Sequence, residues 1–180
     1  MKEQIDFAIG TSDLGLVLVA LSDMGVAAIM IEADRETLSR RISDLFPKAE
    51  LHENAADSKL AVKKILAFIA TPAAKIDLSL DMRGTPFQQK VWTEIMKIPP
   101  GKTSTYTDIA RKIGAPRAMR AVGSACKNSH FSFVVPCHRV TKSDGTYSNG
   151  WPGDGQRILL EREAIAMKAK RTKSVSRRSK

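Results

Sequence analysis

Three short apolar runs separated by turn residues occupy the first 32 positions of this chain. Residues 5–10 (IDFAIG), 14–21 (LGLVLVAL) and 25–32 (GVAAIMIE) each have the length of a β-strand. Only a few residues, TSD and SDMG, separate the runs, and connections this short join antiparallel neighbours. The chain is therefore predicted to begin with a small three-stranded antiparallel meander.

Two helices and a further strand are expected to follow this meander. Asp34 has the side chain of a helix N-cap, and Pro47 stops a helix that ends near Leu45. A second helix is predicted over about 57–70 from its apolar spacing. Residues 76–82 (IDLSLDM) alternate between apolar and polar side chains, which predicts a strand.

The second half of the chain is predicted to be mostly helical. RGTP at 83–86 has the character of a hinge, and Thr85 followed by Pro86 predicts a helix start. Helices are expected to about Lys97, over 106–113, and from Arg117 to about Lys127. The last two, separated by Gly114, resemble a helix-turn-helix.

The end of the chain adds one strand-like segment and one helix. FSFVVPCHRV at 131–140 is rich in β-branched residues, and a last helix is expected from about Asp154 to Ala169. We therefore expect the α+β class, with an N-terminal α/β domain over 1–82 and a helical domain over 83–167. Residues 168–180 are expected to form a basic disordered tail. This tail either adds non-specific phosphate affinity or only increases solubility.

The positive charge is concentrated in two regions. The chain has a net charge of +10, and residues 82–142 carry 11 Lys and Arg against 2 Asp and Glu. Residues 168–180 carry 7 Lys and Arg and no acidic residue, whereas residues 1–81 are mildly acidic. A basic region within a folded-looking middle favours a polyanion, most simply nucleic acid, over ordinary surface lysines.

Composition excludes several other classes of protein. The start, MKEQIDFAIG, lacks the apolar run of a secretory signal, and Ser22 and Asp23 interrupt the most apolar stretch, so no membrane span is expected. Two cysteines suit a reducing compartment. Three scattered histidines have no zinc-ligand spacing. We therefore expect a soluble, metal-free, intracellular protein.

The motif VVPCHRV at 134–140 carries the candidate chemistry. The thiolate of a cysteine is its nucleophilic form, and Cys137 has a potential base in His138. Neighbours on a strand point to opposite faces, so His138 would reach the sulfur through a water or a backbone turn. Glu161 or Glu163 could orient the histidine. Cys126 lies in a small-residue helix without a nearby base, and we interpret it as structural.

Several motifs together resemble one family. PCHRV, preceded by SACKN, MRAVGSA, GKTSTYTDIA and RGTPFQQKVW, is similar to the O6-alkylguanine-DNA alkyltransferases, most closely to the C-terminal half of the Ada-type proteins. The resemblance runs from about Phe7 to Ala166. It implies a ribonuclease H-like N-terminal domain and a winged helix-turn-helix domain that holds the reactive cysteine.

The resemblance also implies an activity. Such proteins bind double-stranded DNA in the minor groove, flip out the damaged guanine and move its O6-alkyl group onto the cysteine, once per molecule. We therefore expect a methylated-DNA–protein-cysteine methyltransferase activity on O6-alkylguanine, and also on O4-alkylthymine. The resemblance also favours a bacterial cytoplasm, and we expect a monomer without a cofactor. The start MKEQIDF favours a complete short form.

The family's functional residues correspond to particular positions here. Cys137 matches the acceptor, His138 the water-linked base and Glu163 the acid that orients it. Arg120 matches the arginine that fills the gap left by the flipped base, and Tyr106 the tyrosine that helps rotate the nucleotide. Further expected contacts with DNA or the guanine are small side chains at Ala121 and Gly123 and the backbone carbonyl of Val140.

Two positions depart from the family pattern. The family has an asparagine eight residues before the cysteine, where this chain has Ser129, with Asn128 beside it. The loop TYSNGWPGDG is one residue short, so either Tyr147 or Trp151 covers the guanine pocket or the pocket is more open. Tyr147 and Ser148 are also expected to contact the substrate. A non-catalytic lesion-binding protein of the same fold is the alternative function. A cysteine hydrolase is a third possible function. Such an enzyme needs an oxyanion hole, and nothing in the sequence marks one.

Overall fold

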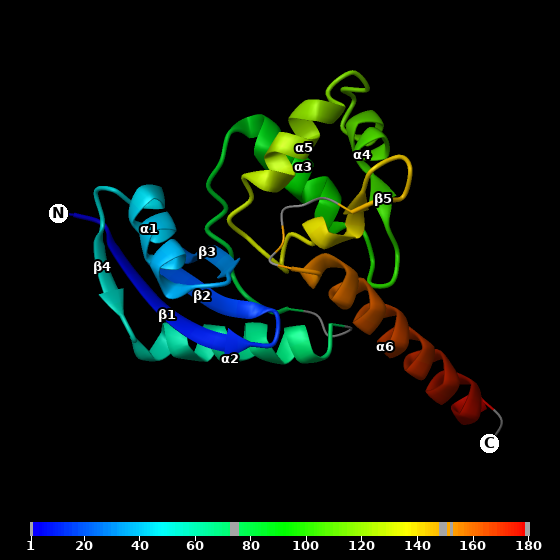
Figure 1. Cartoon of the computed structure of the whole chain (residues 1–180), viewed down its shortest axis with the longest axis horizontal. Coiled ribbons are helices and arrows are strands. Elements are labelled where there is room, and N and C mark those ends of the chain that lie inside the picture. The colour runs from blue at the N-terminus through cyan, green and yellow to red at the C-terminus, as the bar shows by residue number, and fades with distance from the viewer. Residues whose placement is uncertain (1, 73–75, 148–150, 152, 179–180) are drawn as a thin grey trace.

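The computed structural model describes residues 2–72, 76–147, 151 and 153–178 (Figure 1). The first half of the chain contains β1 (Gln4–Ser12), β2 (Gly15–Ser22), β3 (Gly25–Glu32), α1 (Arg35–Leu45), β4 (Glu50–Glu53) and α2 (Ala56–Ala70). The second half contains α3 (Pro86–Met96), β5 (Ser104–Thr105), α4 (Tyr106–Lys112), α5 (Met119–Lys127), the 3₁₀ helix η1 (Cys137–Arg139), β6 (Val140–Thr141) and α6 (Gly155–Arg178). The predicted α+β class is confirmed.

The N-terminal sheet is covered by a helix on each face. Successive β2 residues enter different cores: Val17 and Val19 pack with α2, whereas Leu18 packs with α1. This alternation follows from the two-residue period of a strand. Because both faces are covered, the strands read as nearly continuous apolar runs rather than alternating ones.

The sheet has one strand more than the sequence predicts. The expected meander forms β1, β2 and β3, and β4 pairs in parallel with β1, which gives the order β3-β2-β1-β4. The sequence of β4, ELHE, has one apolar residue among four. Its strand conformation therefore comes from pairing with the free edge of β1, and no local pattern predicts it.

The helical half of the chain begins where the sequence predicts. Thr85 caps α3 with a complete capping box, in which the Thr85 hydroxyl accepts from the Gln88 backbone N–H, and Pro86 opens the helix. Trp92 of α3 is buried and donates its indole N–H to the carbonyl of Ala125 on α5. Gly114, with a φ of 77°, makes the turn between α4 and α5. A helix-turn-helix arrangement therefore packs on α3.

Two segments expected as strands are not strands. Residues 76–82 pair with β3 only around Leu80, and their alternation instead reflects packing of one side against the two cores. Residues 131–136 form turns, because Phe133 has a left-handed φ of 72° that interrupts extended backbone. Only Phe131 forms a bridge, to Ile29 of β3.

The last helix is longer than predicted. The expected disordered tail after residue 167 is wrong as far as Arg178, because α6 continues through it (Figure 1). The segment after Gly155 contains no glycine or proline, and Lys and Arg are good helix formers that suit the negative end of a helix dipole. None of the described helices has the length and apolar character needed to cross a bilayer.

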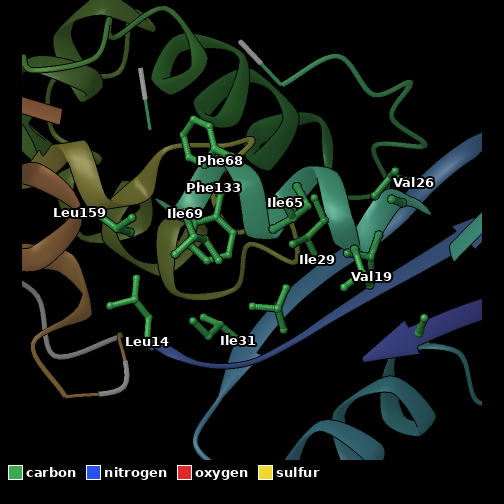
Figure 2. Packing of buried hydrophobic residues seen from close by; sticks show 14 residues of the cluster. Leu14, Val19, Val26, Ile29, Ile31, Ile65, Phe68, Ile69, Phe133 and Leu159 are labelled. Atoms are coloured by element: carbon green, nitrogen blue, oxygen red, sulfur yellow. The ribbon is translucent and has the colours of Figure 1, made fainter. Parts of the chain in front are cut away.

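The two halves of the chain meet just before the candidate site. Ile29 of β3 donates its backbone N–H to His130 and accepts one from Ser132. Phe133 and Leu159 then enter the core between the sheet and α2 (Figure 2). These contacts anchor both chain segments that carry the candidate residues, 130–140 and α6. The domain boundary near residue 83 stays a prediction.

Candidate active site

The short helix η1 separates the side chains of Cys137 and His138. Its 3₁₀ geometry turns about a third of a circle per residue, so neighbours point in different directions. Cys137 is partly exposed on a pocket wall, whereas His138 is fully buried. The sequence predicted a strand here, but the consequence is similar: the two side chains do not share a face.

A buried carboxylate lies beneath η1. Glu163 of α6 is fully buried, and its Oε1 accepts a hydrogen bond of 2.7 Å from His138 Nε2. Arg139 donates to the same carboxylate from Nε and from Nη2, the latter at 2.8 Å, and the Gly101 backbone N–H donates to Oε2 at 2.9 Å. Arg139 also donates to the Ile98 carbonyl. Every strong acceptor direction of Glu163 is therefore occupied.

The charges of this cluster follow from its hydrogen bonds. Burial acts to raise the pKa of Glu163, but the bonds from His138 and Arg139 outweigh it and lower the pKa to about 2. Burial lowers the pKa of His138, and the bond to Glu163 only partly opposes this effect. At neutral pH the pair is thus a carboxylate and a neutral imidazole.

The tautomer of His138 is determined by the same contacts. Because Glu163 accepts at Nε2, the proton of the neutral ring sits on Nε2 and the lone pair on Nδ1. Nδ1 is buried and has no protein hydrogen-bond partner within the part of the chain that the structure describes. This nitrogen is therefore a base without a competing protein donor among those residues.

The pocket beside Cys137 has a volume of about 330 Å³. Of the predicted residues it brings together Cys137, Tyr106, Gly123 and Ser129. A methyl group added at Gly123 would contact the Tyr106 ring at 4.0 Å, so this glycine leaves space beside the tyrosine. A pocket of this size next to a thiol can hold a small planar group.

Trp151 forms part of the same pocket wall. Its ring packs edge-on against His138, with centroids 5.8 Å apart, and against Phe133 at 5.4 Å. Tyr147, the alternative cover, is exposed and does not line this pocket. Ser148 lies outside the described residues. Of the two candidates that can be placed, Trp151 occupies the position next to the site.

The exposed side of α5 continues from the pocket. Arg120 and Ala121 are both exposed on this helix, and Gly123 is half-buried where the helix meets the pocket. Lys127 at the end of α5 also lines the pocket. The helix therefore presents cationic and small side chains on one side of the pocket, an arrangement suited to a nucleic-acid backbone and groove.

Two residues predicted to contact the substrate, Asn128 and Val140, do not line the pocket. Asn128 is exposed, donates to the Ser124 hydroxyl and does not line the pocket, whereas its neighbour Ser129 does. The Val140 carbonyl accepts a bond of 3.1 Å from Gln156 Nε2. A carbonyl oxygen has two lone pairs, so Val140 can still accept a second donor.

Sequence reasoning missed six residues of the pocket wall, which are Ile31, Arg41, Cys126, Lys127, Ser132 and Val135. Arg41 of α1 and Ile31 of β3 line the pocket although they belong to the other half of the chain. Cys126, interpreted as structural, lies on the pocket wall with Cys137. No local signal identifies such residues, because only the packing of α1 and α5 brings them there. Within the described residues, no three His, Cys, Asp or Glu side chains form a metal-binding group.

Comparison with known proteins places the chain among the methylated-DNA–protein-cysteine methyltransferases. Residues 86–165 match the family model of the 6-O-methylguanine DNA methyltransferase DNA-binding domain. The constitutive methylated-DNA–protein-cysteine methyltransferase of Bacillus subtilis is 37% identical over 122 residues, which cover 66% of this chain and 73% of that protein. The bifunctional transcriptional activator and DNA repair enzyme Ada of Escherichia coli is 37% identical over 89% of this chain and 46% of its own length.

Solved structures agree with these sequence matches. The O6-methylguanine methyltransferase of Mycobacterium tuberculosis superposes with a TM-score of 0.74 at 29% identity, over 91% of this chain and 94% of that chain. A complex of the Mycobacterium tuberculosis protein OGT with DNA gives a TM-score of 0.73 at 30% identity, over 89% of this chain and 94% of that one. The chain spans about half the length of the first curated relatives that it matches.

Proposed function

This chain belongs to the family of methylated-DNA–protein-cysteine methyltransferases, and from that premise we propose that it repairs DNA by moving the alkyl group of O6-alkylguanine onto Cys137. O4-alkylthymine, which carries the same alkyl ether on a pyrimidine, is the second proposed substrate. The observation that carries the proposal is a partly exposed thiol placed beside a buried imidazole that a carboxylate holds in one tautomer.

The residues of η1 and α6 would activate the thiol. A thiolate is the reacting form of cysteine, so the proton of Cys137 must leave before or during attack. We propose that this proton passes through a water to Nδ1 of His138, the ring nitrogen that carries the lone pair. Glu163 stabilises the imidazolium that results, and Arg139 holds the carboxylate in place.

The transfer itself is a displacement at the alkyl carbon. A bond forms between Cys137 Sγ and the methyl carbon, and the bond between that carbon and guanine O6 breaks. The electron pair stays on guanine, which takes up one proton, so a thiol and an ether become a thioether and guanine. The methyl carbon of a thioether is a poor electrophile, because a thiolate would have to leave from it, and each molecule therefore acts once.

The exposed side of α5 would bring the lesion to the pocket. A base inside a duplex is out of reach of the thiol, so the nucleotide must flip out. We propose that α5 enters the minor groove, where Ala121 and Gly123 permit close approach, and that Arg120 fills the space of the flipped base. Tyr106 would assist rotation, and Ser129, Asn128 and the Val140 carbonyl would contact the displaced nucleotide.

The remaining proposals concern the state of the protein. One chain supplies the described pocket, its thiol and the exposed helix α5, which supports action as a monomer. Both cysteines are free, which supports a reducing cytoplasm as the compartment. We propose residues 1–82 and 83–167 as the two domains, with double-stranded DNA as the partner and no metal or cofactor.

Intact-protein and peptide mass spectrometry tests the proposal. The protein is incubated with duplex DNA containing O6-methylguanine, and one methyl group is expected on the peptide that contains Cys137. The peptide with Cys126 is the internal control and should stay unmodified. Cys137→Ser should leave the DNA methylated.

Two other results would assign a different function. Tight and selective binding of the methylated duplex without any adduct would support the non-catalytic lesion-binding alternative. Repeated loss of methyl groups from DNA, exceeding the amount of protein and without an adduct, would indicate a hydrolase. Either result contradicts transfer to Cys137.

A further inference from the structure

The two cysteines of the chain lie on the same wall of the candidate pocket. Cys126 lies in the last turn of α5 and Cys137 in η1, and both line the pocket wall. The Cys137 thiol lies close enough to Cys126 to raise the pKa of the Cys126 thiol. Both side chains also pack against the apolar core of the helical half. The only two thiols in the sequence thus lie close together, although 10 residues separate them.

We propose that Cys126 is the resolving thiol of a reversible Cys126–Cys137 disulfide that forms when the site meets a peroxide. The disulfide is a modification at the acceptor sulfur itself. Its effect on repair rests on the proposed function, because a sulfur already bonded to Cys126 has no lone pair with thiolate reactivity to give to an alkyl carbon.

The order of the two steps follows from the surroundings of each thiol. The nearby Cys137 thiol and burial both raise the pKa of Cys126, so this thiol stays protonated and reacts slowly on its own. Cys137 is partly exposed on the pocket, with the imidazole of His138 as the next side chain in the sequence. Both thiols are partly exposed on the pocket wall, so the raised pKa of Cys126, rather than its exposure, makes Cys137 the sulfur that reacts first with a small oxidant.

The chemistry balances with hydrogen peroxide as the oxidant. The Cys137 sulfur attacks one peroxide oxygen, the O–O bond breaks, and a sulfenic acid and water form. The Cys126 sulfur then attacks the Cys137 sulfur, loses its proton, and expels the oxygen as a second water. Two thiols and one peroxide thus become one disulfide and two waters. A dithiol reductant reverses the change by exchange.

Formation of the bond requires local movement. A disulfide needs a sulfur separation of about 2.05 Å, shorter than that of two thiols that are not bonded to each other. His138 and Arg139, next to Cys137, are held by Glu163, whereas Cys126 is in the last turn of a helix. The end of α5 is thus the part expected to shift. Without Cys126, a sulfenic acid at Cys137 can be oxidised further to the irreversible sulfinic acid.

The test compares the full-length chain with Cys126→Ser under stoichiometric peroxide. In the unsubstituted protein we expect the intact mass to fall by two hydrogens and a peptide linking residues 126 and 137 to appear. Methyl transfer should fall at least tenfold relative to the same sample before oxidation, and dithiothreitol should restore it. Cys126→Ser should gain oxygen at Cys137 and should not recover fully after dithiothreitol.

Two other results would overturn the inference, and a third would reject the proposed function instead. Sulfinic acid at Cys137 with Cys126 still open to alkylation, in the unsubstituted protein, rejects the resolving role. A disulfide between two chains on a non-reducing gel rejects it as well. Failure of methyl transfer in fully reduced protein instead rejects the proposed function, and the mass of the oxidised protein still decides whether the disulfide forms.

Discussion

The buried contact between Glu163 and Arg139 supports a stability prediction that can be worked from the structure. Replacing Glu163 by Gln removes the negative charge but keeps the shape of the side chain. It leaves the guanidinium of Arg139, which is only 6% exposed, without an anion in the protein interior. The amide NH₂ of glutamine would also face groups that are themselves donors, Arg139 and the Gly101 N–H.

The expected magnitude follows from this burial. Removing one partner of a buried ion pair costs about 3–5 kcal/mol of unfolding free energy. Arg139→Met should cost a similar amount, because Glu163 then keeps only His138 and Gly101 as donors. The double variant should cost far less than the sum, with a coupling of about 2–3 kcal/mol.

Urea unfolding followed by tryptophan fluorescence measures these free energies. The matched control is Glu161→Gln on the same helix, where an exposed Arg157–Glu161 pair should contribute no more than about 1 kcal/mol. A cost for Glu163→Gln equal to that of the control would refute the reasoning. So would strictly additive costs of the two single substitutions.

Two further predictions concern DNA and pH. Arg120→Ala should slow transfer from duplex DNA more than transfer from free O6-alkylguanine base, because only the duplex has a gap to fill; equal losses in a single-turnover rate assay would reject the wedge role. The free energy of unfolding should fall as the pH is lowered. The pKa of Glu163 is near 4.5 in the unfolded chain and about 2 in the folded protein. The contribution of Glu163 to this free energy is therefore complete above pH 4.5 and is lost as the pH falls towards 2. By pH 3.5 this group alone should remove about 1.4 kcal/mol, and His138, whose pKa is lowered by burial, adds a loss that begins below its usual value. Unfolding free energies that are level from pH 6 to 3.5 would contradict this.

Local sequence signals were sufficient for much of the fold. Asp34 and Thr85 cap helices as their side chains predict, and the three apolar runs form three paired strands. These features depend on contacts between residues close in sequence. The predictions that failed involve partners far away in the chain. The strand β4 forms by pairing with the edge of β1, and residues 76–82 pair with β3 only around Leu80.

The residues of the candidate site likewise divide into those that the sequence predicts and those that only the structure identifies. PCHR predicts a candidate nucleophile and a neighbouring candidate base, because a reactive thiol needs a base and these residue types supply both. The choice between Glu161 and Glu163 is not readable, since both lie on the last helix. The structure shows Glu161 paired with Arg157 on the surface and Glu163 buried against His138.

The sequence by itself determined the capped helices and the α+β class, and it predicted which thiol is the candidate acceptor. Only the tertiary structure decided that Cys126 lies near Cys137, that Arg41 reaches the pocket from the other half of the chain, and that α6 continues to Arg178. The physical reason is the distance along the chain between the residues that interact. Capping and strand alternation depend on neighbours in the chain, whereas pocket walls and buried ion pairs depend on how separate elements pack.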